Sequence, residues 1–151
     1  MKLNERAPDF TLKDADGSDW KLSDKLGKTV VLLFYPGDNT PVCTKQLCSV
    51  RDNWEIYAAT GAEVVGISTD SAASHKNFAK KHDLPLTLLA DENGTVARTY
   101  NAASWLPNRS ARAVVVIDKD GVIRHHKVQP VSLFRPKDDE VLEAIRKAKE
   151  D

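Results

Sequence analysis

One apolar run, together with the segment that follows it, constrains the fold of this chain more than any other feature. Residues 29–35 are almost all apolar and predict a strand that is buried on both faces. A loop rich in Pro, Gly, Asp and Asn comes next, and Thr40-Pro41 then marks the start of a helix. Thr is a good N-cap residue and Pro is favoured at the first helical position, so the chain passes from a buried strand through a short loop into a helix.

Strands and helices alternate along the rest of the chain. Strands are expected at 9–12 and 19–22, paired as a hairpin, and then at 29–35, 62–68, 84–90, 113–117 and 122–127. Helices are expected at about 43–60, at 71–82, just before Tyr100 and at about 137–149. This pattern indicates an α/β domain that occupies residues 1–151, with a mixed central sheet flanked by helices and an N-terminal β-hairpin.

The composition excludes several classes of partner. The chain carries 22 basic and 22 acidic residues, so it has no electrostatic footprint for nucleic acid or for an anionic membrane. No apolar run approaches the roughly 20 residues of a membrane span, and the N-terminus lacks the apolar core of a secretory signal. We therefore expect a cytoplasmic protein. In a reducing compartment, two cysteines favour a redox or catalytic use over a disulfide scaffold.

Cys43 and Cys48 are the only cysteines of the chain. Cys43 falls in the first turn of the predicted helix, where unpaired N–H groups and the positive end of the helix dipole favour a thiolate. On one regular helix, a spacing of five residues separates the two Cα atoms by roughly 8–9 Å, whereas a disulfide requires less than about 7 Å. The two cysteines therefore either never bridge, or bridge only when the first turns of the helix unwind.

The residues alone leave other interpretations open. Cys43 also lies on the apolar stripe of its helix and would suit a small core side chain. Cys48 points to a different face and would suit a packing or surface thiol. A thioredoxin-type oxidoreductase would need a Cys-x-x-Cys spacing, which is two residues shorter than the spacing here.

No metal site is expected. Structural zinc usually needs four Cys or His ligands, often paired at short spacing, and none of the four histidines forms a close motif with the cysteines. His75 and His82 share a helix face and could meet a ligand, but solvated helix histidines are the commoner case. His125 and His126 point to opposite faces of a strand.

A longer motif surrounds the first cysteine. Pro36, Thr40 and Cys43 match the pattern Pro-x-x-x-Thr-x-x-Cys, and Cys48 follows five residues later. In these residues the chain resembles the peroxiredoxins, specifically the PrxQ type, which is also called bacterioferritin comigratory protein. The resemblance extends over almost the whole chain, at residues 7–10, 51–52, 66–68, 88–91, 112 and 116–121.

This resemblance implies a thioredoxin-like fold and a thiol peroxidase that needs no cofactor and no metal. In such an enzyme the peroxidatic Cys43 thiolate would attack one peroxide oxygen, leaving a sulfenic acid and expelling water or an alcohol. The Thr40 hydroxyl and the backbone N–H groups of Val42 and Cys43 would polarise the O–O bond. Arg112 would add a permanent positive charge beside the thiolate, and Pro36 would shape and shield the pocket.

Three arginines compete for the role beside the thiolate. Arg112 begins the strand at 113–117, which in a thioredoxin-like sheet would run antiparallel to the strand at 29–35 and so bring Arg112 to the Cys43 loop. Arg112 is therefore preferred over Arg109 and Arg51, and Arg51 is expected to support the site through a salt bridge.

The resemblance also implies how turnover is completed. Cys48, as the resolving cysteine, would attack the Cys43 sulfenate, and a thioredoxin or a similar dithiol would reduce the resulting disulfide. Hydrogen peroxide and small organic hydroperoxides are the expected substrates, and a monomer is the expected state. The competing hypotheses are a non-peroxidatic thiol–disulfide oxidoreductase or redox-regulated binding protein, and a structural domain whose cysteines only fill the core.

Overall fold

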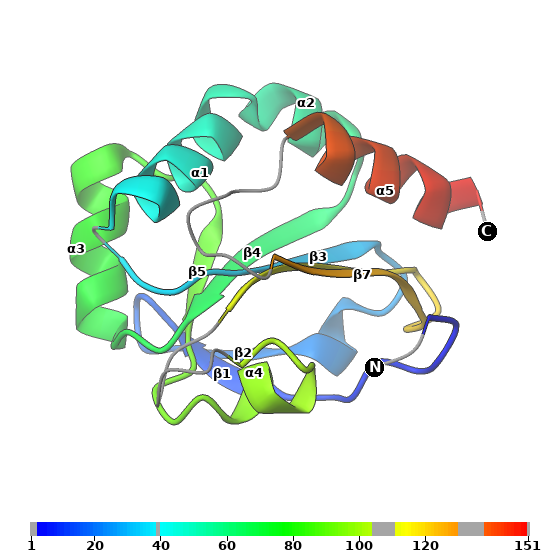
Figure 1. Ribbon diagram of the computed structural model, residues 1–151, viewed down its shortest axis with the longest axis horizontal. Coiled ribbons are helices and arrows are strands. Elements are labelled where there is room, and N and C mark those ends of the chain that lie inside the picture. The colour runs from blue at the N-terminus through cyan, green and yellow to red at the C-terminus, as the bar shows by residue number, and fades with distance from the viewer. Residues whose placement is uncertain (1–2, 39, 104–110, 130–137, 151) are drawn as a thin grey trace.

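The computed structural model describes residues 3–38, 40–103, 111–129 and 138–150. Its centre is a seven-stranded sheet with the strand order β2-β1-β5-β4-β3-β6-β7 (Figure 1). The strands are β1 (Thr11–Asp14), β2 (Asp19–Lys21), β3 (Val30–Phe34), β4 (Glu63–Ser68), β5 (Thr87–Ala90), β6 (Arg112–Ile117) and β7 (Ile123–Gln129). Strand β3 is parallel to β4 and antiparallel to β6, and β1 and β2 form an antiparallel hairpin. The predicted α/β class, mixed sheet and N-terminal hairpin are confirmed.

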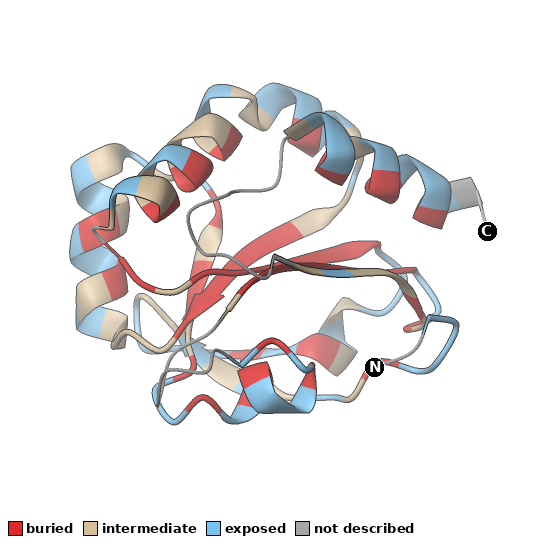
Figure 2. Ribbon diagram, in the orientation of Figure 1, coloured by how far each residue is buried: buried red, intermediate tan, exposed pale blue. Residues whose placement is uncertain are grey.

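Helices cover both faces of the sheet. Four of them lie on one face: α1 (Pro41–Asp52), α2 (Trp54–Ala59), α3 (Ala72–His82) and α5 (Asp138–Glu150) (Figure 1). The short helices α4 (Thr95–Thr99) and η1 (Leu22–Lys25), the latter of the 3-10 type, lie on the other face. In Figure 2 the buried residues of these helices follow the sides that are turned toward the sheet. None of the described helices is long and apolar enough to cross a membrane.

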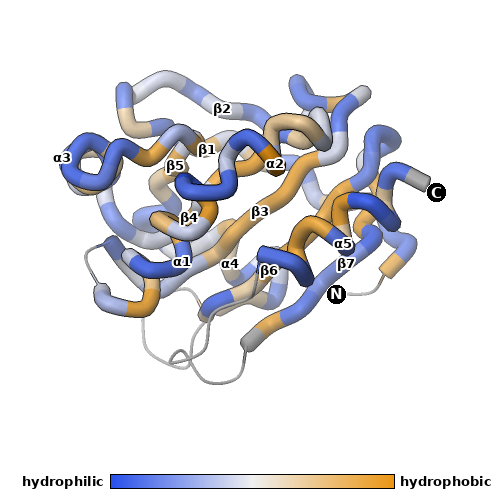
Figure 3. The backbone as a smooth tube through the Cα atoms, turned by 90° about the horizontal axis from the view of Figure 1, so that it is seen from above, coloured by the Kyte–Doolittle hydropathy of each residue, from blue (hydrophilic) through white to orange (hydrophobic). Residues whose placement is uncertain are grey.

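Strand β3 lies between two hydrophobic cores because its successive side chains point to opposite faces of the sheet. Leu32 and Phe34 pack in one core together with Tyr100, which follows α4. Val31 and Leu33 pack in the other core, beneath α1, α3 and α5. All five β3 residues are buried, as the apolar run predicts, and Figure 3 shows the strand as an apolar band through the middle of the fold. Each such side chain contributes about 1.5–3 kcal/mol relative to its exposed state.

The single helix predicted at about 43–60 is wrong, because the structure contains two helices separated by Asn53. The Asn53 side-chain amide donates to the Ser49 carbonyl at 2.9 Å and to Asp138 Oδ2 at 3.3 Å. The break lies at Asn53, whose backbone leaves the helical region at φ −108° and ψ 17° while its side chain bonds to Ser49 and to Asp138 of α5. The rest of the helical segment is correctly predicted.

The other element boundaries differ by a few residues at most where the structure describes them. Strand β5 begins three residues later than predicted, since Pro85 has no N–H to give to a strand pairing. Helix α3 begins after Ser71, whose hydroxyl accepts from the Ser74 N–H at 3.1 Å as an N-cap. The predicted turn between β6 and β7 is present, with Gly121 in the left-handed conformation at φ +83°.

Candidate active site

The loop that follows β3 and the first turn of α1 form the candidate active site. Pro41 is the first residue of α1 and Cys43 the third, and the Cys43 side chain is fully buried. The first N–H groups of a helix have no acceptor within the helix and carry the positive end of its dipole. The Cys43 sulfur therefore lies where the helix stabilises a negative charge, at the place the sequence predicts.

Arg112 is the first residue of β6 and contacts Cys43 directly. Phe34 pairs with Ala113, which brings the start of β6 to the end of β3 from which the loop leaves the sheet. The Arg112 Nη2 donates to Cys43 Sγ at 3.1 Å, and the guanidinium is almost fully buried. A buried cation needs partners, and the Cys43 sulfur and a neighbouring side-chain oxygen both accept hydrogen bonds from this one. The predicted juxtaposition of Arg112 and Cys43 is confirmed, while the catalytic role of Arg112 stays a prediction.

Gln46 is a component of the site that the sequence analysis missed. Its Oε1 accepts from Arg112 Nη1 at 2.5 Å, and its side chain is buried. Gln46 lies three residues after Cys43 on α1, and this spacing places both side chains on the same side of the helix. The spacing was therefore an available signal. Because the amide is neutral, Gln46 orients the Arg112 guanidinium without neutralising its charge.

Thr40 is the N-cap residue of α1, as predicted, but it makes no side-chain capping bond. Its hydroxyl donates instead to the Gly37 carbonyl at 3.1 Å, across the loop. This bond fixes the loop in a compact turn directly before Cys43, and the hydroxyl must leave Gly37 to donate to a peroxide oxygen. Pro36 is half-buried at the start of the same loop, and its shielding role stays a prediction.

Cys48 lies on α1 together with Cys43, but it is only half-buried. Both cysteines are free thiols. Helix α1 runs without a break from Pro41 to Asp52 and so contains both residues in regular helical geometry. This agrees with the spacing argument, by which the two sulfurs cannot bridge while the helix is intact.

The two competing arginines have different outcomes. Arg51 Nη1 donates to the His82 carbonyl at 2.7 Å, and its Nε pairs with Asp52 at 3.0 Å. Arg51 thus connects the end of α1 to the end of α3 and forms a salt bridge with its neighbour Asp52, while its support of the site stays a prediction. Arg109 lies outside the described residues.

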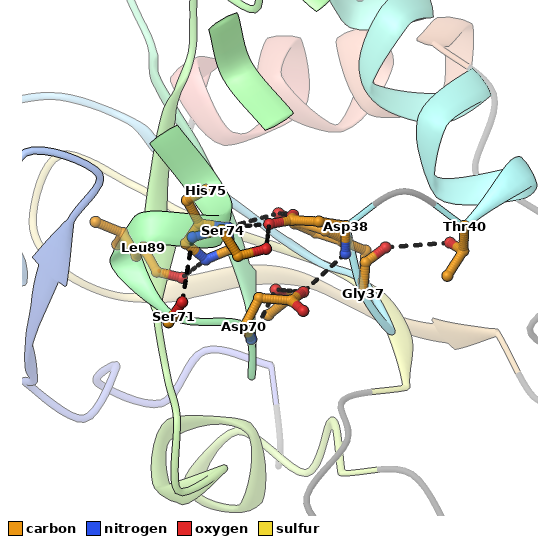
Figure 4. Close-up of polar contacts among 10 residues, drawn as sticks. Gly37, Asp38, Thr40, Asp70, Ser71, Ser74, His75 and Leu89 are labelled. Atoms are coloured by element: carbon orange, nitrogen blue, oxygen red, sulfur yellow. Dashed lines mark hydrogen bonds and ion pairs between the residues drawn. The ribbon is translucent and has the colours of Figure 1, made fainter. Parts of the chain in front are cut away.

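The expectation that His75 is a solvated helix side chain is wrong. His75 is fully buried on α3, where Nδ1 lies 2.9 Å from Asp38 Oδ2 and Nε2 lies 2.9 Å from the Leu89 carbonyl oxygen (Figure 4). Asp38 belongs to the same loop as Thr40, and it also accepts from the Ser74 hydroxyl at 2.8 Å. Sequence spacing could place His75 on the buried side of α3, beside Phe78, but not identify its partners.

Asp38, Asp70 and His75 are the group of described residues whose ligand-type atoms come close enough to surround a cation, within 4.8 Å of one another. Hydrogen-bond donors already face these atoms. Asp70 Oδ2 accepts from the Asp38 N–H at 2.7 Å and from the Ser68 hydroxyl at 2.7 Å. A cation would have to displace these N–H and O–H groups, so the arrangement fits a hydrogen-bond network better than a metal centre.

Comparisons with known sequences agree with this geometry. The sequence profile of the AhpC/TSA family matches residues 3–126. The chloroplastic peroxiredoxin Q of Triticum aestivum is 53% identical over 119 residues, which cover 78% of this chain and 55% of that relative. The chain thus spans a little over half the length of this curated relative.

Two solved structures are similar over nearly the whole chain. Peroxidoxin BcpB from Mycobacterium tuberculosis superposes with a TM-score of 0.88 at 34% identity, covering 99% of both chains. The reduced 2-Cys peroxiredoxin of Plasmodium vivax gives a TM-score of 0.88 at 28% identity, covering 97% of this chain and 81% of that one. These matches confirm the predicted thioredoxin-like fold.

Proposed function

The chain belongs to the AhpC/TSA family as a peroxiredoxin of the Q type, and from this premise we propose that it is a thiol peroxidase that acts through Cys43. Its substrates are hydrogen peroxide and small organic hydroperoxides, and its electrons come from a thioredoxin or a similar dithiol. The observation that carries the proposal is the 3.1 Å contact between the Arg112 guanidinium and the Cys43 sulfur at a helix N-terminus.

The first half-reaction forms one S–O bond and breaks one O–O bond. The Cys43 thiolate attacks the terminal oxygen of the peroxide and becomes a sulfenic acid. The other oxygen leaves as hydroxide or alkoxide and takes up a proton to give water or an alcohol. Arg112, Thr40 and the first N–H groups of α1 are the donors that stabilise the charge developing on these oxygens.

The second half-reaction joins the two cysteines. The Cys48 thiol attacks the Cys43 sulfenic sulfur, an S–S bond forms, and the sulfenic oxygen leaves as water. Because α1 holds the two residues apart, its first turns must unwind before this step. A dithiol reductant then attacks the disulfide by exchange and is itself oxidised, which returns both thiols.

The proposal is tested by following peroxide consumption in the presence of thioredoxin, thioredoxin reductase and NADPH. Wild-type protein should turn over, and Cys43→Ser should not. Cys48→Ser should react once, giving a Cys43 sulfenic acid that is detected by mass spectrometry, and should lose efficient cycling. A Cys43→Ser protein with wild-type turnover would refute the proposal. A wild-type protein that reduces test disulfides but reacts with peroxide no faster than a free thiol would indicate the alternative oxidoreductase function.

Two further properties stay predictions of the sequence. The monomeric state is checked by size-exclusion chromatography coupled to light scattering, on both the reduced and the oxidised protein. The cytoplasmic location is checked by fractionation of cells that express the full-length protein.

A further inference from the structure

A buried polar network joins the active-site loop to α3. Asp38 Oδ1 accepts from the Tyr35 hydroxyl at 2.6 Å, while Asp38 Oδ2 accepts from the Ser74 hydroxyl at 2.8 Å and lies 2.9 Å from His75 Nδ1. On the other side of the ring, His75 Nε2 lies 2.9 Å from the Leu89 carbonyl oxygen of β5. Figure 4 shows Ser74 and His75 of α3 gathered around Asp38, with the Thr40–Gly37 contact next to them along the loop.

Counting protons in this network determines the state of His75. The Leu89 carbonyl can only accept, so Nε2 must carry a hydrogen. Nδ1 faces a carboxylate oxygen, so the 2.9 Å contact with Asp38 also needs a proton between the two atoms. The Tyr35 and Ser74 hydroxyls each supply one donor to Asp38. Without the proton between His75 and Asp38, the Tyr35 and Ser74 hydroxyls would be two donors facing three acceptor atoms, which are His75 Nδ1 and the two Asp38 carboxylate oxygens. The contact between Nδ1 and Asp38 Oδ2 would then be repulsive.

Within the Asp38–His75 pair, Asp38 is ionised. Burial alone would raise the pKa of Asp38, but the hydrogen bonds from His75 and Tyr35, the charge of His75 and the Ser74 hydroxyl together hold that pKa below its ordinary value. Burial and the neighbouring Asp38 carboxylate raise the pKa of Tyr35 well above its ordinary value, so its hydroxyl remains a donor. The shared proton then resides on the ring, and His75 is an imidazolium with two N–H donors.

Asp38 is part of the active-site loop, so the contacts that hold Asp38 also hold the loop. Its own N–H donates to Asp70 Oδ2 at 2.7 Å, so both its main chain and its side chain are held. The preceding residue, Gly37, provides the carbonyl that accepts from the Thr40 hydroxyl at 3.1 Å. The position of Asp38 therefore sets the position of the Gly37 carbonyl, and with it the rotamer of Thr40 and the start of α1, three residues before Cys43.

We propose that His75 is a positioning residue for the peroxide reaction, because the proton that it shares with Asp38 fixes the loop that presents Thr40 and the first turn of α1 to the substrate. This inference rests on the proposed peroxidase function.

Groups from three segments of the fold face His75. Asp38 and Tyr35 face it from the β3–α1 side, Asp70 lies beyond Asp38 in the segment between β4 and α3, and β5 contributes the Leu89 carbonyl. The anchoring needs the shared proton and is lost when that donor is removed. Burial keeps bulk water from replacing the missing donor.

Three variants separate the roles of the proton, the ring and the fold. His75→Leu removes both N–H donors. His75→Asn keeps an amide that can donate to Asp38 but has no proton to lose in the neutral range. His82→Asn is the matched control, because it changes the other histidine of α3, which is partly exposed and packs edge-on against Phe78. Circular dichroism establishes that each variant is folded.

The kinetic readout is the second-order rate of Cys43 oxidation, measured by stopped-flow tryptophan fluorescence with hydrogen peroxide. We expect His75→Leu to react about tenfold more slowly, a change equivalent to about 1.4 kcal/mol. His75→Asn should remain within about threefold of wild type at neutral pH, since one charge-assisted donor is retained in weaker form. His75→Asn should therefore react several-fold faster than His75→Leu, a rescue that a purely space-filling role of the ring would not give. The His82→Asn rate should match the wild-type rate.

A spectroscopic readout does not depend on activity. In reduced wild-type protein with ¹⁵N-labelled histidine, NMR should show hydrogens on both ring nitrogens of His75 at neutral pH. A His75 ring with an unprotonated Nδ1 would overturn the proposal, and so would a folded His75→Leu variant that oxidises at the wild-type rate. If His75→Leu does not fold, the His75→Asn rate and the NMR spectrum decide. If the wild type itself does not react faster than a free thiol, the peroxidase function fails, while the NMR spectrum still tests the protonation of His75.

Discussion

Replacing Arg112 by Met removes a buried guanidinium that contacts the Cys43 sulfur, and the structure allows the size of the effect to be worked out. With the charge centres about 4 Å apart and an effective dielectric constant of about 20, the attraction between the guanidinium and a thiolate is about 4 kcal/mol. The Nη2–Sγ distance of 3.1 Å supports this separation. The cost of desolvating the two charges offsets part of the attraction, so we expect the ionisation of Cys43 to become about 2–3 kcal/mol less favourable.

This change is measured most directly by the ultraviolet absorbance of the thiolate, which does not require a reagent to reach the buried sulfur. In a Cys48→Ser background only Cys43 contributes. At a pH where the thiol form predominates, Arg112→Met should lower the thiolate population roughly 30- to 150-fold, and the rate of oxidation by peroxide should fall at least as far. Arg112→Lys keeps the charge but loses the planar fork that also binds Gln46, so its effect should be smaller.

Arg51→Met is the matched control, because it removes the same charge from a guanidinium that is bound to His82 and Asp52 instead of to Cys43. It should leave the thiolate absorbance close to that of the wild type. The reasoning is refuted if a folded Arg112→Met protein has the thiolate absorbance and the peroxide reactivity of the Arg51→Met control.

Three further predictions concern stability. Gly66→Ala should cost about 1–3 kcal/mol in urea unfolding, because a Cβ there would lie 2.9 Å from Leu88 Cδ2 in the buried core. Asp118→Asn should cost about 1–3 kcal/mol at neutral pH, since the carboxylate accepts from two turn N–H groups and pairs with Arg124 at 2.7 Å. Burial would raise the pKa of Asp118, but these bonds hold it below its ordinary value, so the difference from wild type should begin to shrink below about pH 4 and vanish only once the pH falls below that lowered pKa. Asp138→Ala should cost about 2–3 kcal/mol, because Asp138 accepts from three side chains of α1, α2 and the residue between them.

Each of these predictions has a result that contradicts it. Wild-type stability in Gly66→Ala would mean that the neighbouring side chains can move aside. A constant difference between Asp118→Asn and wild type down to low pH would show that the carboxylate charge is not what stabilises the turn. An Asp138→Ala loss no larger than that of Asp139→Ala, an exposed neighbour on the same first turn of α5, would mean that the bonds to α1 and α2 contribute nothing.

Much of the local structure could be predicted because its causes act within a few residues. The apolar run at β3, the Pro41 helix start and the Gly121 turn each follow from neighbouring side chains or from backbone preferences. Asn53 shows the limit of this approach, since helical periodicity continues through it while its backbone leaves the helical region and its side chain bonds to the distant Asp138. Thr40 shows another, because its N-cap position was predictable but the choice of the Gly37 carbonyl as acceptor depends on how the loop folds back.

The sequence by itself determined where Cys43 lies on its helix and that Cys48 cannot reach it while that helix is intact, because rise and rotation per residue are the same in every α-helix. Only the tertiary structure decided what surrounds the sulfur. Arg112 lies 69 positions after Cys43 in the chain, and His75 lies 37 positions after Asp38. The order and direction of the strands bring each pair into contact. A buried charge is stabilised by the side chains that the sheet places around it. Sequence patterns within one helix or one strand do not predict which side chains those are.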